Sequence, residues 1–133
     1  MKTLIFTTIY AILSLTFLSC DEKDSPIPDD NNEESIDNDF YYVKYQISGG
    51  LYFNIDQVMY NTEKGEKYED FSAAKSFETT CGPVTKNFNA KIEITDRRGT
   101  PPLNAIKISI SKNNGPFAVK ASGQYSASYT IDF

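Results

Sequence analysis

The chain has no histidine and no tryptophan among its 133 residues, and it holds only two cysteines, Cys20 and Cys81. Histidine is the usual general base near neutral pH and the commonest metal ligand, so its absence removes the Ser-His-Asp route to nucleophilic catalysis. Two cysteines without histidine also cannot complete a zinc site of the Cys/His type. These absences favour a non-catalytic protein, and we expect no metal and no cofactor.

Long apolar runs are also scarce, and the one clear run covers residues 4–18 without a charged side chain. As a helix it would be about 22 Å long, which is short of the roughly 30 Å hydrocarbon core of a bilayer. Lys2 precedes it and Ser19 follows it, and a basic start, a short apolar run and a small residue are typical of a secretory signal. We therefore expect residues 1–19 to be a signal peptide. An uncleaved N-terminal membrane anchor is the alternative.

The last residues of the signal and the residue after it read Phe17-Leu18-Ser19-Cys20, which resembles the lipobox of bacterial lipoproteins. That pattern has an apolar residue three positions before the cysteine and a small residue just before it. The resemblance implies cleavage before Cys20, a diacylglycerol thioether on its sulfur and acylation of the new amino terminus. More than one acyl chain gives stable attachment, so the implied partner is a membrane. A disulfide between Cys20 and Cys81 is the alternative, and a lipidated sulfur would exclude it.

Charge is distributed unevenly after Cys20. Residues 21–39 hold nine acids and one base, a net charge of −8, whereas residues 40–133 hold nine acids and eleven bases, a net of +2. The acidic stretch is poor in large apolar side chains and cannot bury enough surface to offset the entropy cost of ordering. We expect residues 20–39 to form a lipidated, acidic, disordered linker.

The acids after Cys20 also resemble the signal that directs lipoproteins of Bacteroidetes to the outer face of the outer membrane. The resemblance implies an outer-membrane lipoprotein exposed at the cell surface. Nucleic acid is not an expected partner, because the largest basic cluster, Arg97-Arg98, is too small for such a surface.

From Phe40 onward, apolar and polar residues alternate in short runs separated by Gly, Asn and Pro, which predicts β-strands. We expect Gly82-Pro83 to end one strand, residues 96–104 to form a loop, and residues 70–75 to hold at most one helical turn. The apolar rows are Tyr41, Val43, Tyr45 and Ile47; Phe88, Ala90, Ile92 and Ile94; Ile106, Ile108 and Ile110; and Phe117, Val119 and Ala121.

Seven or eight such strands predict an all-β domain over residues 40–133, an antiparallel, immunoglobulin-like β-sandwich after the disordered tether. A partly open barrel is the alternative. The Cys…Trp…Cys core of antibody domains is missing, so the likeness is one of architecture. The segments YYVKYQISGG, YNTEKGE and GPVTKNFNAKIEI and the closing strand resemble small single-domain lipoproteins of Bacteroidetes, whose folds are similar to the mycobacterial small membrane proteins. The mycobacterial proteins are accessory partners of transporters.

Fifteen aromatic residues lie in residues 40–133, and most must belong to the core. Tyr42, Tyr52, Tyr60 and Tyr68 break a strand's alternation or lie near turns, so we expect some of them to form a binding patch for a protein or a glycan. Cys81 is expected to be a buried, inert thiol, and the spacing of the acids selects no catalytic pair. The sequence therefore favours a binding or adhesion module. A structural or accessory subunit of an outer-membrane or transport complex, and a small hydrolase, are the alternatives.

Overall fold

The computed structural model describes residues 38–133, so the predicted signal peptide 1–19, Cys20 and nearly all of the predicted linker lie outside the described part. Residues 38–133 form eight strands. Within this described part, no helix is long and apolar enough to cross a bilayer. The strands are β1 (Tyr41–Ser48), β2 (Asn54–Thr62), β3 (Gly65–Ala74), β4 (Ser76–Val84), β5 (Asn89–Arg98), β6 (Ile106–Lys112), β7 (Ala118–Gly123) and β8 (Ser126–Thr130).

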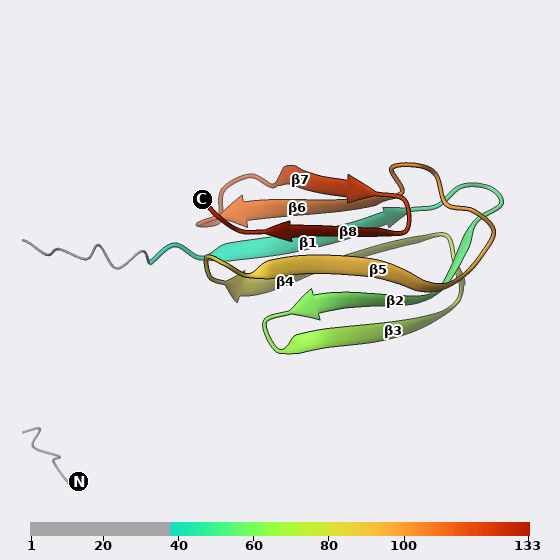
Figure 1. The fold of residues 1–133 in the computed structure, drawn as a ribbon, viewed down its shortest axis with the longest axis horizontal. Coiled ribbons are helices and arrows are strands. Elements are labelled where there is room, and N and C mark those ends of the chain that lie inside the picture. Colours follow the sequence, from blue (N-terminus) through green and yellow to red (C-terminus); the bar gives the residue numbers. More distant parts are fainter. Residues whose placement is uncertain (1–37) are drawn as a thin grey trace, which may run out of the picture. The chain divides into compact units, whose positions relative to one another are not determined.

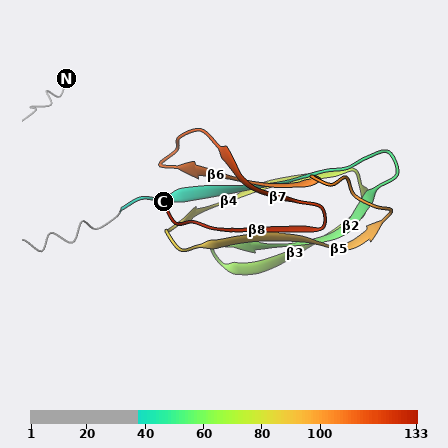
Figure 2. The same ribbon diagram turned by 45° about the horizontal axis from the view of Figure 1, so that its top comes forward.

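The strands form two four-stranded antiparallel sheets, with the orders β4-β1-β6-β7 and β3-β2-β5-β8. Figure 1 shows the strands running along the long axis of the domain, and Figure 2 shows the two layers facing each other. The predicted sandwich is confirmed. Its connections differ from those of antibody domains, which keep the first two strands in one sheet, because here β1 and β2 lie in different sheets.

The core lies between the sheets and is made of the predicted alternating rows. In β1, Tyr41, Val43, Tyr45 and Ile47 are all at most 1% exposed, while the residues between them face outward. Burying an aliphatic or aromatic side chain of this size stabilises a fold by about 1.5–3 kcal/mol. The rows of β5 and β6 contribute Ala90, Ile92, Ile94, Ile106, Ile108 and Ile110. Buried residues of β2, β4, β8 and the adjoining loops complete the core.

Gly82-Pro83 does not end its strand, contrary to the sequence-based prediction. β4 continues to Val84, which pairs with Tyr41 after a register shift between Tyr41 and Val43. Gly82 makes this possible with a φ of 129°, and a Cβ there would lie 2.7 Å from the Tyr41 carbonyl oxygen. A local pattern could not reveal the shift, because it depends on how two distant strands pair.

Residues 70–75 contain no helical turn, which agrees with the expectation of at most one. β3 runs to Ala74 and contains Ala73 at a φ of 60°, next to a register shift against β2. The Ala73 amide donates a hydrogen bond of 3.2 Å to the carboxylate of Asp56 on β2. β5 extends to Arg98, three residues into the predicted loop 96–104, because Asn54 and Arg98 are paired.

The predicted row of Phe117, Val119 and Ala121 is divided by a bulge. Ala121 pairs with Ile108 and Val119 pairs with Ser109, so Lys120 is the extra residue. Ala121 therefore packs against the core, whereas Val119 lies on the outer face with an exposed fraction of 58%. Phe117 is 40% exposed, and the ammonium of Lys44, an outward residue of β1, lies 4.4 Å from its ring centroid.

The strand directions define two ends of the domain. The described chain begins beside the start of β1, and the C-terminus lies at the same end (Figure 1). We call this the proximal end. β1 runs away from it, so the β1–β2 loop (49–53) and the β5–β6 loop (99–105) lie together at the opposite, distal end, with the β3–β4 and β7–β8 connections.

Candidate functional site: the distal loops

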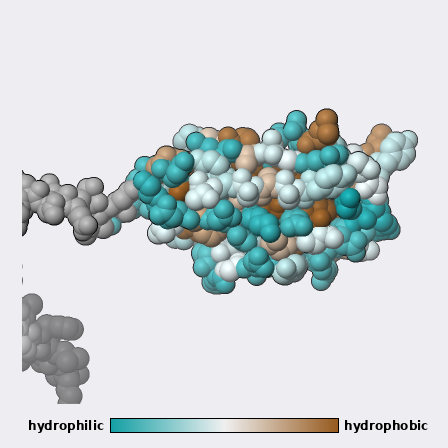
Figure 3. Space-filling model, viewed as in Figure 1, coloured by the Kyte–Doolittle hydropathy of each residue, from teal (hydrophilic) through white to brown (hydrophobic). Residues whose placement is uncertain are grey.

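The distal loops carry the most exposed large hydrophobic side chains of the described chain. Leu51 is 88% exposed, Tyr52 90% and Leu103 77%. Leucine is normally among the most buried residue types, and one exposed leucine needs no explanation, but a group of exposed large side chains at one end is informative. Figure 3 shows hydrophobic side chains projecting from this end of the domain. We refer to Leu51, Tyr52 and Leu103 as the distal cluster.

Backbone hydrogen bonds fix the two loops side by side. The Ser48 amide, at the end of β1, donates to the Ala105 carbonyl at 2.8 Å, which joins the β1–β2 loop to the β5–β6 loop. Each loop also closes on itself, since the Phe53 amide donates to the Gly50 carbonyl at 3.2 Å and the Ala105 amide to the Pro102 carbonyl at 3.0 Å. A Cβ on Gly50 would lie 3.8 Å from the Pro102 ring. The two loops are therefore close to each other at Gly50 and Pro102.

The β1–β2 loop is also held by its own buried side chain, Phe53, and by contacts with Lys75 and Gly99. Phe53 is only 1% exposed and anchors the loop in the core. The Lys75 ammonium donates to the carbonyl oxygens of Leu51, at 3.3 Å, and Phe53, at 3.5 Å. Gly99, with a φ of 84°, passes so close to the loop that a Cβ there would lie 2.0 Å from the Tyr52 carbonyl oxygen. The distal cluster thus projects from a backbone that is already ordered.

The distal connections carry almost no charge. Residues 49–53, 99–105 and 124–125 contain no Asp, Glu, Lys or Arg, and the β3–β4 connection is the single residue Lys75. Lys75 is therefore the one charged residue within the distal connections themselves.

Two arginines lie just behind the distal loops, at the end of β5. The Arg97 guanidinium lies over the Tyr125 ring, 4.4 Å from its centroid. Arg98 binds the Asp56 carboxylate through two hydrogen bonds of 2.8 and 2.7 Å. These bonds from Arg98 hold the pKa of Asp56 below its ordinary range. Of these two arginines, Arg98 is the one that forms an ion pair with a carboxylate in the described part of the chain, whereas Arg97 lies over an aromatic ring.

The four tyrosines predicted from the sequence do not form one patch. Tyr52 belongs to the distal cluster. Tyr42 is half-buried on the outer face of the β1 sheet, where its ring meets Phe40 edge-on at 6.0 Å. Tyr68 is 56% exposed on the outer face of the other sheet. Tyr60 is only 2% exposed, so the expectation that it could face solvent is wrong.

Tyr60 is buried because it shares the inward face of β2 with Val58, and its nearness to the hairpin in sequence was misleading. Its hydroxyl donates a hydrogen bond of 2.5 Å to the Glu69 carboxylate, which also accepts one of 2.7 Å from Lys67. Burial raises the pKa of Tyr60, and the Lys67 ammonium lowers the pKa of Glu69. Tyr60, Glu69 and Lys67 are thus linked by hydrogen bonds at one flank of the core.

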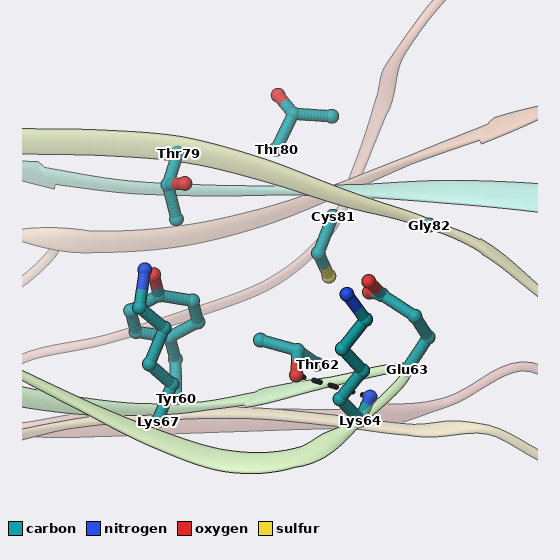
Figure 4. Close-up of a pocket in the computed structure, with 9 residues that line it drawn as sticks. All are labelled: Tyr60, Thr62, Glu63, Lys64, Lys67, Thr79, Thr80, Cys81 and Gly82. Atoms are coloured by element: carbon teal, nitrogen blue, oxygen red, sulfur yellow. Dashed lines mark hydrogen bonds between the residues drawn. The ribbon is translucent and has the colours of Figure 1, made fainter.

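A polar cleft of about 350 Å³ lies beside the β2–β3 hairpin, towards the proximal end. Figure 4 shows the side chains of Lys64 and Lys67 directed into it from the hairpin and that of Cys81 from β4. The lining residues are Tyr60, Thr62, Glu63, Lys64, Lys67, Thr79, Thr80, Cys81 and Gly82.

Cys81 is a poor nucleophile in this cleft. It is half-buried, and its sulfur lies 3.6 Å from the carbonyl oxygen of Asn61, which also accepts a hydrogen bond from the Tyr45 hydroxyl at 2.8 Å. Burial, together with the charge of Glu63, raises the pKa of Cys81 to about 11. The thiol is therefore protonated at neutral pH. Within residues 38–133, no three acids or cysteines lie close enough together to hold a metal ion.

Sequence reasoning missed Leu51 and Leu103, although a signal was present. Both leucines lie in short stretches, GGLYF and TPPLN, where Gly or Pro breaks the strand pattern and no charged residue accompanies the apolar one. An uncharged, turn-forming loop that holds a large apolar side chain is a candidate contact site, whereas Tyr52 alone could not show that two loops meet.

Comparison of the chain with protein-family models, with curated proteins and with solved structures finds no match.

Proposed function

We propose that this protein is a lipid-anchored envelope protein whose β-sandwich is a non-catalytic binding module, with the distal cluster as its contact surface. The observation that carries the proposal is the exposure of Leu51, Tyr52 and Leu103 at the end opposite the one where the chain enters the domain. A tether attached at the proximal end leaves the distal end free to meet a partner.

The energetics support this use of the cluster. Burying a large hydrophobic side chain contributes about 1.5–3 kcal/mol, so three exposed side chains can supply a useful share of a binding free energy. The loops are held by the Ser48–Ala105 hydrogen bond and by Lys75, so little conformational entropy remains to be lost on binding.

The proposed anchor is Cys20, acylated after cleavage of residues 1–19, and the acidic stretch that follows is the proposed tether. We place the protein in the outer membrane, exposed at the cell surface, on the strength of the lipobox and the acids that follow Cys20. The described chain joins the domain at Asp39, whose carboxylate accepts a hydrogen bond of 2.6 Å from the Asn113 side chain.

The anchor is tested by mass spectrometry of the mature N-terminus and by external protease on intact cells, with Cys20→Ala as the control. We expect an acylated Cys20 in the wild-type protein and cleavage of its domain from outside the cell. The control should lack the acyl chains. An unmodified amino terminus would refute the anchor, and a domain protected from protease would refute surface exposure.

The contact surface is tested by placing a photo-crosslinking side chain at position 52 in cells that make the protein. Position 68, which is exposed on a sheet face away from the distal loops, is the matched control. We expect crosslinks from position 52 to its partner molecule and few from position 68. Replacing Leu51 and Leu103 by serine should reduce the crosslinks from position 52. Equal crosslinking from both positions would count against a distal contact surface.

A further inference from the structure

We infer that the distal cluster inserts into the interfacial region of a lipid bilayer, so that the partner of the proposed binding module is a membrane surface. The inference rests on the proposed function, because it gives the distal contact surface a ligand of defined chemistry. Three observations support it: the kind of side chain that the distal loops expose, the charge around those side chains and the reach of the proposed tether.

The side chains are those that suit an interface between water and hydrocarbon. Leu51 and Leu103 are aliphatic, and Tyr52 combines an apolar ring with a hydroxyl, the combination that enriches tyrosine at the boundary of membranes. Their exposed fractions are between 77% and 90%. Insertion of such side chains needs only a shallow entry into the headgroup and acyl boundary.

A second copy of the domain is a poorer partner. The polar cleft described above is lined by threonine, lysine and glutamate side chains, together with the ring of Tyr60, Cys81 and Gly82. Two lysines point into it in Figure 4. Leucine side chains placed there would strip water from these polar groups without replacing their hydrogen bonds. The cleft therefore offers no apolar socket for the distal cluster.

The charge around the loops also favours a membrane that contains anionic lipid. The distal connections hold no acidic residue, and Lys75 lies directly behind the cluster, bound to the carbonyl oxygen of Leu51. Arg97, near the end of β5, lies over the Tyr125 ring. Each cation near a negatively charged lipid surface adds to the attraction. The paired acid at this end, Asp56, is neutralised by Arg98.

The proposed tether is long enough for the domain to turn its distal end to the membrane that holds the anchor. Nineteen residues, 21–39, span at most about 65 Å when extended. An eight-residue strand such as β1 is only about 27 Å long. The same reach also allows contact with a neighbouring bilayer. The net charge of −8 on residues 21–39 is repelled by anionic lipid, so the uncharged distal loops are the favoured contact.

The absence of tryptophan provides a direct test, because one introduced tryptophan is the only one in the protein. We would prepare the mature lipoprotein with Tyr52→Trp and, as matched control, with Tyr68→Trp. Each is reconstituted into vesicles of phosphatidylcholine and phosphatidylglycerol, with and without lipid brominated near the headgroup end of its acyl chains. Both positions are exposed, so neither substitution disturbs the core.

At position 52 we expect a blue-shifted emission and roughly twofold quenching by brominated lipid, because the ring would lie at the acyl boundary. Position 68 should keep the emission of a solvated indole. Adding Leu51→Ser and Leu103→Ser to Tyr52→Trp should remove the quenching. Emission at position 52 that is unquenched, or quenched no more than at position 68, would overturn the inference.

Flotation of the same vesicles separates this inference from the proposed function. A protein that floats with the vesicles but shows no quenching at position 52 keeps its lipid anchor and loses only the membrane-inserting role. A protein that does not float has no anchor, which refutes the proposed function itself. Crosslinks in cells from position 52 to a protein, with none to lipid, would also overturn the inference and identify a protein partner.

Discussion

Asp56 joins three strands of one sheet through a single carboxylate. It lies on β2, binds Arg98 of β5 through two hydrogen bonds, and accepts the amide of Ala73 on β3. Register shifts in both neighbouring pairs occur at this point, so the carboxylate compensates for hydrogen bonds that the strands do not make with each other. The β1–β2 loop ends just before this part of β2, and the β5–β6 loop begins just after Arg98. Asp56 therefore also holds together the strand ends from which the distal loops project.

At the residue scale we predict that Asp56→Asn lowers the melting temperature by a few degrees at neutral pH. Arg98 holds the folded-state pKa of Asp56 below that of the unfolded chain, so the carboxylate adds stability above the unfolded value, near 3.9. This contribution disappears as the pH falls through the folded-state pKa. Thermal unfolding followed by circular dichroism should show the wild-type and variant curves converging at acid pH.

Glu93→Gln is the control for this prediction. Its ion pair with Lys91 is longer, at 3.5 Å, and both side chains are about 40% exposed, so its loss should change the melting temperature little. If Asp56→Asn and wild type differed equally at every pH, the charge of Asp56 would not be the source of the effect.

At the scale of elements, the two distal loops depend on a glycine at their contact. Gly99 has a positive φ of 84°, and a Cβ there would collide with the Tyr52 carbonyl oxygen at 2.0 Å. Gly65, in the β2–β3 hairpin, has a φ of 110° but nothing within 4 Å of the same position. Replacing each of these two glycines by alanine therefore separates the cost of backbone strain, present at both positions, from the cost of displacing a neighbouring loop, present only at Gly99.

We predict that Gly65→Ala lowers the free energy of unfolding by about 1–2 kcal/mol, the cost of strain at positive φ. Gly99→Ala should cost more, because the β1–β2 loop must move as well. Urea denaturation measures both. The quenching of a tryptophan at position 52 by brominated lipid should fall in Gly99→Ala and persist in Gly65→Ala. Equal losses of stability would show that the contact between the loops is unimportant.

At the scale of the whole molecule, β3 is an edge strand that is exposed along most of its length. Edge strands can pair with other chains, and inward-pointing charges are one known protection. Lys67 pairs with Tyr60 and so shares its inward face, where it binds Glu69. A charged residue on the inward face of β3 would have to be buried if a further strand joined this edge.

We predict that Lys67→Val increases self-association, measured as apparent mass by light scattering at rising protein concentration. Lys91→Val is the matched control, because it also removes a lysine that contacts a glutamate, but on the central strand β5. The two variants have the same net charge, so a difference between them reports the position of the lysine. Similar behaviour of the two variants would argue against edge protection by Lys67.

The amino-acid sequence by itself determined the strands and most of the core. Side chains alternate across a strand whatever surrounds it, so the rows of β1, β5 and β6 could be read directly as inward faces. The length and the number of the strands then led to the sandwich.

Only the tertiary structure decided the bulges, the burial of Tyr60 and the distal cluster. The extra residue at Lys120 and the register shift beside Gly82 arise from pairing between separate strands, which no local pattern encodes. Leu51 and Leu103 belong to loops far apart in the chain, and these loops lie side by side because the end of β1 pairs with the start of β6. Local periodicity fixes which way a side chain points, whereas long-range pairing fixes which side chains become neighbours.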